Sequence, residues 1–308
     1  MSVFRSKILV IRGGAIGDFI LTLPAIAALR RQFPDAYLEV LGYPHIARLA
    51  IAGGLVHQTR SLEGRDLAAF FGRGATLTEE LRDYFSEFDL IISYLYDPDL
   101  IFRTNVGRCS PAQFIAGPHR PDEKSGLHAT HAFLKPLERL AIFDADPVPR
   151  LSITAAGLPG SDARFLALHP GSGSEAKNWA ESRWAELLEV LVNSTGHSLL
   201  LLGGEAEGER LQRLAAALPP LRTRVAQSLP LTELAALLAN CLGFVGHDSG
   251  ISHLAAAVGL GGLILWGDTT QEVWRPMSKT MVVLRNPEGL DRLDAAEVFQ
   301  SIHRLWPN

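Results

Sequence analysis

Three loops in the second half of the chain carry residue types that bind phosphates and sugar hydroxyls. The segment His169–Trp179 combines free backbone amides, hydroxyls and Lys177, which suit a phosphate group. The segment Gly203–Glu207 ends in an acid able to accept hydrogen bonds from ribose, and His247–His253 brings Asp248 and a Ser-Gly pair to the start of a predicted helix. Each loop alone is also typical of a solvated turn or a helix start. Together, the three loops predict a nucleotide diphosphate site.

A glycine-rich turn in the first half of the chain ends in Asp18, which has two interpretations. The turn, Arg12–Asp18, follows the apolar run Lys7–Arg12 and leads into a helix. Aspartate is among the best N-capping residues, so a cap alone explains its presence. A carboxylate held at a helix N-terminus is also placed to remove the proton of an attacking hydroxyl, because aspartate is ionised at neutral pH. Both interpretations stay open at this point.

Particular residues argue against two other phosphate-binding motifs. A dinucleotide fingerprint needs G-x-G-x-x-G, but Arg12 occupies the position of the first glycine. Tyr43 ends the second predicted strand, where an acid would bind the ribose of NAD. The segment His169–Trp179 lacks the Gly-Lys-Ser/Thr ending of a Walker loop. NAD binding is therefore disfavoured.

His128 and His131 are the residues most easily taken for metal ligands. They lie three apart on a predicted helix that runs to Leu140, and no third ligand is identifiable. The two cysteines lie far apart, without the spacing of a zinc site or a disulfide framework. The sequence therefore predicts no tightly bound metal. Lys177 and helix N-termini would neutralise a departing diphosphate instead.

Short apolar runs alternate with helical patterns along the whole chain, as in parallel sheets joined by crossover helices. The segment Thr154–Ser161 is rich in small residues and turn formers and is predicted to be a linker. The predicted fold is α/β, with two doubly wound Rossmann-like domains, 1–156 and 157–308, facing each other across a cleft. Ligands then belong at the carboxyl ends of the strands. The predicted strands are Lys7–Arg12, Tyr37–Gly42, Leu90–Tyr96, Phe114–Gly117, Phe165–His169, Ser198–Leu202, Gly243–Gly246, Gly262–Trp266 and Met281–Leu284, and the clearest predicted helices are Ala25–Gln32, Trp184–Asn193 and Leu231–Asn240.

The composition of the chain excludes several classes of function. Its 308 residues carry a net charge of -4 and are 47% hydrophobic, as expected for a folded globular protein. Basic residues are scattered among acidic ones, which argues against a nucleic-acid partner. The apolar runs are far shorter than the roughly 20 residues that span a bilayer, so any membrane contact would be peripheral. The two cysteines and the lack of a signal-peptide pattern at the start predict a cytoplasmic protein.

The order and spacing of these motifs resemble glycosyltransferase family 9, the ADP-heptose:lipopolysaccharide heptosyltransferases, over nearly the whole chain. The opening segment KILVIRGGAIGDFILTLPAIAA is similar to the first strand, Gly-Asp turn and Leu-Pro helix of that family. The segments LHPGSGSEAKNW, LLLGGEAE and GHDSGISHLAAA are similar to its phosphate loop, ribose turn and C-terminal signature. The last two also resemble other glycosyltransferases of the same fold, so the opening segment carries most of the specificity.

The resemblance implies a GT-B fold and inverting transfer without an essential metal or cofactor, the ADP-sugar being a co-substrate. It implies a lipopolysaccharide core or other glycan acceptor against the N-terminal domain, and a last helix, near 291–305, that packs back on that domain. Asp18 matches the catalytic base. Either Glu205 or Glu207 would bind ribose, and the spacing to Arg210 favours Glu207. The donor contacts implied are Ser172, Gly173, Lys177, Glu207, Asp248, Ser249, Gly250 and His253, and the acceptor contacts are Arg12, Gly17 and His131.

Two rival functions fit the same motifs. An epimerase, a hydrolase or a glycosyltransferase with another nucleotide donor would use the same two domains, and the first two would turn over donor without an acceptor. A non-catalytic nucleotide-binding protein would have no need of an acid at position 18, although helix capping explains Asp18 equally well.

Overall fold

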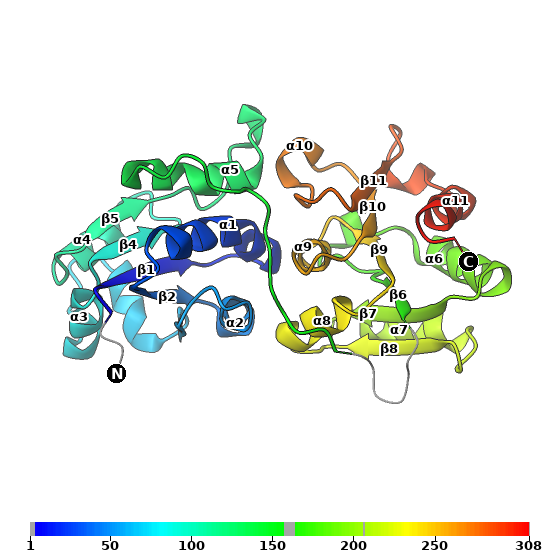
Figure 1. The fold of residues 1–308 in the computed structure, drawn as a ribbon, viewed down its shortest axis with the longest axis horizontal. Helices are drawn as coiled ribbons and strands as arrows, with labels where there is room; N and C mark the ends of the chain where they lie inside the picture. The colour runs from blue at the N-terminus through cyan, green and yellow to red at the C-terminus, as the bar shows by residue number, and fades with distance from the viewer. Residues whose placement is uncertain (1–3, 157–163, 206, 308) are drawn as a thin grey trace. The chain divides into compact units, whose positions relative to one another are not determined.

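The computed structural model describes residues 4–156, 164–205 and 207–307 and divides into two compact units (Figure 1). The units are Met1–Pro149 and Arg150–Asn308. Each contains one sheet in which all strands run parallel. In the described part of the chain, no helix is both long and apolar enough to cross a bilayer.

The second compact unit includes the segment 150–156, and the domain boundary predicted between 156 and 157 stays a prediction. The backbone N–H of Leu151 donates to the carbonyl of Ala257 at 2.8 Å, and that of Ala156 donates to the carbonyl of Ala236 at 2.9 Å. These bonds hold the segment 150–156 along helices of the second unit. Residues 157–161 of the predicted linker lie outside the described residues.

The first unit has a five-stranded sheet in the order β3-β2-β1-β4-β5. The strand order reverses between β1 and β4, so their carboxyl ends flank a crevice that binds ligands in many α/β folds. The strands are β1 (Ser6–Arg12), β2 (Ala36–Gly42), β3 (Gln58–Ser61), β4 (Leu90–Ser93) and β5 (Gln113–Ala116). The helices are α1 (Ile16–Gln32), α2 (Pro44–Ala52), α3 (Glu79–Ser86), α4 (Ile101–Gly107) and α5 (Ala129–Leu134), with 3₁₀ turns η1 (Arg65–Phe71), η2 (Glu123–Ser125) and η3 (Lys135–Leu140).

Helices cover both faces of this first sheet. Leu9 and Ile11 of β1 point into a core built with Phe70 of η1, Phe85 of α3 and Phe102 of α4. On the other face, α1 packs against α2 and α5. With both faces buried, β1 must be apolar throughout, which is why a continuous apolar run predicted it.

The second unit has a six-stranded sheet in the order β11-β10-β9-β6-β7-β8. Here the order reverses between β6 and β9, which places the loops after these strands at a second crevice of the same kind. The strands are β6 (Phe165–Leu168), β7 (Ser198–Gly203), β8 (Thr223–Gln227), β9 (Gly243–His247), β10 (Gly262–Trp266) and β11 (Met281–Arg285). The helices are α6 (Glu181–Ser194), α7 (Gly208–Ala216), α8 (Leu231–Leu238), α9 (Gly250–Ala257), α10 (Gln271–Trp274) and α11 (Ala295–Leu305), with 3₁₀ turns η4 (Glu175–Lys177) and η5 (Leu290–Arg292).

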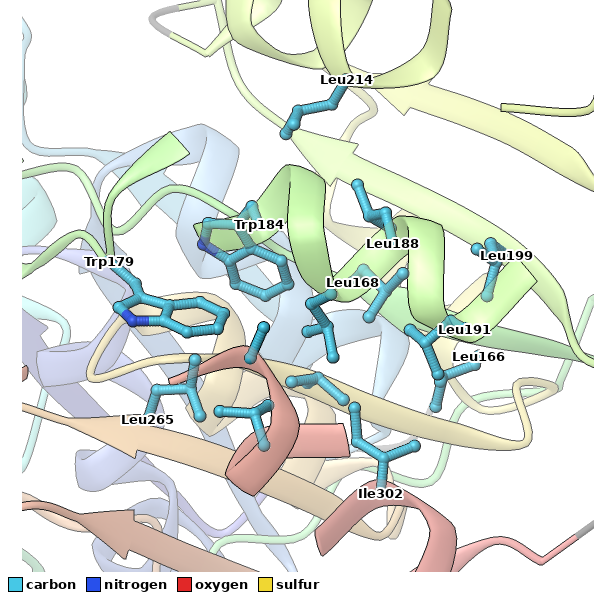
Figure 2. Close-up of a cluster of buried hydrophobic side chains, with 14 of the residues drawn as sticks. Leu166, Leu168, Trp179, Trp184, Leu188, Leu191, Leu199, Leu214, Leu265 and Ile302 are labelled. Atoms are coloured by element: carbon cyan, nitrogen blue, oxygen red, sulfur yellow. The ribbon is translucent and has the colours of Figure 1, made fainter. Parts of the chain in front are cut away.

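The C-terminal helix α11 packs within the second unit, whereas we expected it to return to the N-terminal domain. Val298 and Ile302 enter the same buried cluster as Trp184 and Leu188 of α6. Figure 2 shows Trp184, Leu188 and Ile302 pointing into one apolar interior. The helix presents one apolar stripe, and α6 with the sheet already buries it. The chain is anchored further by Trp306, whose carbonyl lies 3.0 Å from Nε2 of His197.

Two strands are absent from the predicted elements. Strands β3 and β8 are short edge strands with polar, partly exposed residues, so they carry no apolar run. Helix α1 begins at Ile16, close to the helix start predicted at the Gly-Asp turn, and continues through Pro24 as one helix. The proline is buried in the helix interior, where packing overrides its usual breaking effect.

Candidate functional site

Asp18 lies in the first turn of α1, where its side chain caps the backbone N–H of the N-cap residue. The N-cap is Ala15 and not Asp18, which is the third helical residue. Its Oδ2 accepts a hydrogen bond of 3.0 Å from the backbone N–H of Ala15. A Cβ on Gly14, whose φ is +97°, would lie 2.9 Å from Oδ2, so this turn needs glycine. The Asp18 side chain is 26% exposed and remains accessible to a ligand.

Arg12 is buried next to Asp18 and forms an ion pair with it. Its side chain is 1% exposed, and Nη2 lies 3.5 Å from Asp18 Oδ1. Nη1 donates to the carbonyl of His119 at 2.8 Å, and the guanidinium lies 4.5 Å from the centre of the Phe133 ring. Burial lowers the pKa of Arg12, and the Asp18 carboxylate opposes this effect. Arg12 therefore lies buried beside Asp18, and its contact with an acceptor stays a prediction.

The other two predicted acceptor contacts lie in different places in the first unit. Gly17 is partly buried in the first turn of α1, next to Asp18. His131 is exposed on α5, the helix that packs against α1. Their contact with an acceptor stays a prediction.

In the second unit, Lys177 and Asp248 meet although they are far apart in sequence. Lys177 Nζ lies 2.7 Å from Asp248 Oδ2, which also accepts a hydrogen bond of 2.7 Å from Thr269 Oγ1. The Asp248 side chain is 9% exposed and that of Lys177 is 39% exposed. The Lys177 ammonium group is therefore accessible to solvent, whereas the Asp248 carboxylate is buried and accepts two hydrogen bonds. Sequence reasoning missed Thr269, because the loop after β10 carries no recognisable motif.

Glu207 is the acid that lies against the loop after β6. It is 9% exposed, and its Oε2 accepts a hydrogen bond of 2.9 Å from the Gly204 N–H. A Cβ on Gly171 would lie 2.4 Å from Glu207 Cγ, so the glycine permits this close approach. Glu205, the alternative ribose acid, is exposed. The geometry favours Glu207, and its contact with ribose stays a prediction.

The remaining donor candidates lie on the same two loops. Ser172 Oγ lies 2.8 Å from the carbonyl of Ser174, and Gly173 has a φ of +77°. Ser249 caps α9 and accepts a hydrogen bond from the Ser252 N–H at 3.4 Å. Gly250 and His253 follow in the first turn of α9, where His253 is buried.

His247 is a residue that the motif analysis did not select, and it ties the loop after β6 to β9. Its Nε2 accepts a hydrogen bond of 2.9 Å from the Trp179 N–H, at the far end of the loop. Its Nδ1 lies 3.3 Å from the carbonyl of Gly171, near the start of the loop, and therefore carries the proton. A polar residue ending an otherwise apolar strand was the available signal. Burial lowers the pKa of His247 to about 3 and that of the neighbouring His169 to about 4.

The His247→Gln variant is expected to lose less stability in acid than the wild type. Because the folded pKa lies below the unfolded value of 6.5, stability is lost as the pH falls through 6.5. At about pH 5, this histidine alone removes about 2 kcal/mol. Glutamine cannot take up the proton, yet its oxygen can still accept from Trp179. Urea unfolding followed by fluorescence monitors this unit, because all 5 tryptophans lie in it.

The control for this measurement is His303→Gln, which replaces an exposed histidine of the same unit. It should show the full wild-type loss between about pH 8 and about pH 5. An equal acid sensitivity in the His247 variant and the wild type would contradict the assignment of a neutral, buried imidazole.

Among the described residues, no group of three or more His, Cys, Asp or Glu side chains is arranged to hold a metal ion. Metal-independence and the absence of a cofactor stay predictions.

Comparison with known proteins identifies similarity at the level of family and fold. A family model described as glycosyltransferase family 9 (heptosyltransferase) matches residues 139–303, more than half of the chain. Lipopolysaccharide heptosyltransferase 3 of Escherichia coli is 22% identical over 95% of this chain and 97% of its own length. Lipopolysaccharide heptosyltransferase 1 of Salmonella typhimurium is 32% identical over 46% of this chain and 44% of its own length.

Solved structures share the fold over the full length. A glycosyltransferase family 9 protein of Veillonella parvula aligns with a TM-score of 0.79 and 18% identity, covering 99% of this chain and 98% of its own. The E. coli heptosyltransferase WaaC, solved with ADP, aligns with a TM-score of 0.74 and 20% identity, covering 97% of this chain and 100% of its own. The predicted α/β fold of the GT-B class is confirmed.

Proposed function

Because the chain belongs to glycosyltransferase family 9 and is therefore a glycosyltransferase, we propose that it transfers a heptose from ADP-heptose to a lipopolysaccharide core acceptor. The names of its relatives, lipopolysaccharide heptosyltransferases, support the heptose and the acceptor, and the related WaaC was solved with ADP. The same proposal puts the protein in the cytoplasm, in peripheral contact with the membrane that holds its acceptor.

One observation supports the donor site most directly, namely the meeting of Lys177 and Asp248 at the switch point of the second sheet. Lys177 offers an accessible cation to a diphosphate, together with the amides of the loop after β6. Glu207 lies against that loop and suits the ribose hydroxyls. The donor would therefore lie across the carboxyl ends of β6, β7 and β9.

The proposed reaction is a single displacement at the anomeric carbon. Asp18 removes the proton of the acceptor hydroxyl while its oxygen forms the new glycosidic bond. The bond from the anomeric carbon to the diphosphate breaks with its electron pair on ADP, and Lys177 stabilises that charge. Attack from the face opposite the leaving group inverts the configuration. Arg12 holds the Asp18 carboxylate in place through Nη2.

A panel of nucleotides tests the donor. We expect ADP at about 100 times its dissociation constant to stabilise the second unit by about 2.7 kcal/mol, and UDP, GDP and CDP to stabilise it far less at the same concentration. The measurement is thermal unfolding followed by tryptophan fluorescence. Selective stabilisation by UDP would contradict the ADP-heptose proposal.

Turnover assays separate the rival activities. A transferase consumes ADP-heptose quickly only when an acceptor is present, whereas an epimerase or hydrolase consumes it alone. Binding of ADP without turnover in either assay would favour a non-catalytic nucleotide-binding protein.

A further inference from the structure

Two cations lie at the loop after β6, and each is paired with a carboxylate of this chain. Lys177 Nζ lies 2.7 Å from Asp248 Oδ2. Arg210 of α7 donates from Nη2 to both oxygens of Glu175, at 3.1 Å and 2.8 Å. Glu175 begins the 3₁₀ turn η4, which ends at Lys177. A diphosphate that approaches this loop therefore meets two internal ion pairs.

The two carboxylates differ in how firmly they are held. The Asp248 side chain is 9% exposed and also accepts from Thr269 Oγ1, whereas the Glu175 side chain is 82% exposed. Separating a buried carboxylate from its cation leaves an unpaired buried charge. An exposed carboxylate can turn into water, which solvates it, so an exposed ion pair is easily broken. Glu175 is therefore the carboxylate that an incoming anion can replace.

Arg210 lies beside the part of the loop proposed to bind the donor. Its side chain is 17% exposed, and Nη1 donates to the carbonyl of Pro170 at 3.4 Å, near the start of the loop. Glu207, the N-cap of the same helix, lies against Gly171 of this loop. The guanidinium is therefore next to the acid proposed for ribose and on the same loop as Lys177.

The guanidinium of Arg210 has hydrogen-bonding capacity that Glu175 does not use. Its buried Nε has no hydrogen-bond partner in the part of the chain that the structure describes. Glu181 Oε2 lies 3.6 Å from this Nε, but both oxygens of Glu181 accept from Arg213 at 2.8 Å. A guanidinium offers five N–H donors in one plane and binds phosphate through pairs of them. Hydrogen bonding to Arg210 lowers the pKa of Glu175, so the carboxylate that occupies Nη2 is ionised at neutral pH.

We propose that Glu175 is an internal competitor of the donor, and that the diphosphate displaces its carboxylate and binds the Arg210 guanidinium in its place. The displaced carboxylate turns into solvent, so the guanidinium exchanges one anion for another. The proposal rests on the proposed function, because ADP-heptose supplies the diphosphate. It goes further by assigning a second cation to the leaving group and a residue of this chain that holds this cation until the donor binds.

Isothermal titration calorimetry with three probes tests this exchange. ADP carries the diphosphate, inorganic pyrophosphate carries phosphates without a nucleoside, and adenosine carries no phosphate. Glu175→Gln should bind ADP and pyrophosphate about threefold more tightly than the wild type, because an exposed ion pair no longer has to be broken. Arg210→Gln should bind both about tenfold more weakly. Adenosine should bind equally to all three proteins.

The double variant separates displacement from simple repulsion. When Glu175→Gln is added to Arg210→Gln, no further gain is expected, because the competitor has lost its target. An equal gain in both backgrounds would show that Glu175 repels phosphate from a distance and would overturn the proposal. Glu209→Gln is the matched control, since this 95% exposed acid of α7 pairs with Arg213 at 3.6 Å. Its affinities for ADP and pyrophosphate should match the wild type.

The remaining outcomes separate this proposal from the proposed function. Unchanged or weaker binding of ADP and pyrophosphate to Glu175→Gln would overturn the exchange, even if Arg210→Gln did not fold. Heptose transfer with wild-type phosphate affinities in both single variants would overturn the role of Arg210 and leave the proposed function standing. The expected affinities without transfer from any ADP-sugar would support the exchange and refute the function. A wild type that binds neither ADP nor pyrophosphate would overturn both.

Discussion

The Asp18→Asn variant is expected to lose at least about 100-fold in transfer rate while binding ADP with near wild-type affinity. Asparagine has almost the same shape, and its oxygen can still accept from the Ala15 N–H, so this capping hydrogen bond survives. What disappears is the ability to take a proton from the acceptor hydroxyl, together with the negative charge opposite the buried Arg12 guanidinium. The rate is measured with saturating ADP-heptose and acceptor, and ADP affinity by calorimetry.

Asp294→Asn provides the matched control, because Asp294 caps α11 and its Oδ1 accepts from the Glu297 N–H at 2.7 Å. The same chemical change at another helix N-terminus should leave the transfer rate unaltered. If Asp18→Asn retained its activity, Asp18 would be a capping residue only. If it lost activity in proportion to a loss of thermal stability, the rate would not identify a base.

Lys177→Met is expected to lower the transfer rate by about 100-fold and to weaken ADP binding. Methionine keeps much of the length of the side chain but cannot stabilise the diphosphate as it departs. The change also leaves Oδ2 of the Asp248 carboxylate, which is 9% exposed, with the Thr269 hydroxyl as its remaining hydrogen-bond donor among the described residues. Part of the lost affinity for ADP therefore comes from a negative charge that now faces the phosphates.

A double-mutant cycle separates these two causes. Asp248→Asn in the Lys177→Met background removes the uncompensated charge and should restore part of the ADP affinity, but not the rate. Lys7→Met, which removes a lysine paired with Glu87 in the first unit, is the control for loss of a positive charge. A normal rate in Lys177→Met would show that another group stabilises the leaving diphosphate.

The sequence was most informative where strands are buried on both faces. Residues 8–11 of β1 are all buried, so an unbroken apolar run was visible. Strands β3 and β8 lie at sheet edges, and their polar residues are of the kind that is typical of loops. Edge pairing depends on the neighbouring strand, which a local pattern cannot show.

Positions that depend on tertiary contact were harder to predict. The amphipathic pattern of α11 predicts that Val298 and Ile302 are buried, but it does not identify α6 as the helix against which they pack. The spacing of the first turn is compatible with Asp18 as the N-cap, and only the backbone shows that Ala15 holds that position. Arg12 follows an apolar strand, and its burial beneath Asp18 required the Phe133 ring from a distant helix.

The loops at the carboxyl ends of the strands of the second unit contain residues that the sequence predicted and residues that it missed. Their residue types predicted that Lys177 and Asp248 would serve one site, and the structure brings them within 2.7 Å. Thr269 and His247 complete that arrangement through contacts between loops, for which the sequence offers no spacing rule.

The two hydrogen bonds of His247 also bear on how a ligand would be received. Because Gly171 and Trp179 are both held to the end of β9, the segment between them is closed into a ring by non-covalent bonds. A loop held in this way loses little conformational entropy when a ligand binds. The loop is therefore preorganised, and the proposed binding of a diphosphate would lose little free energy to ordering it.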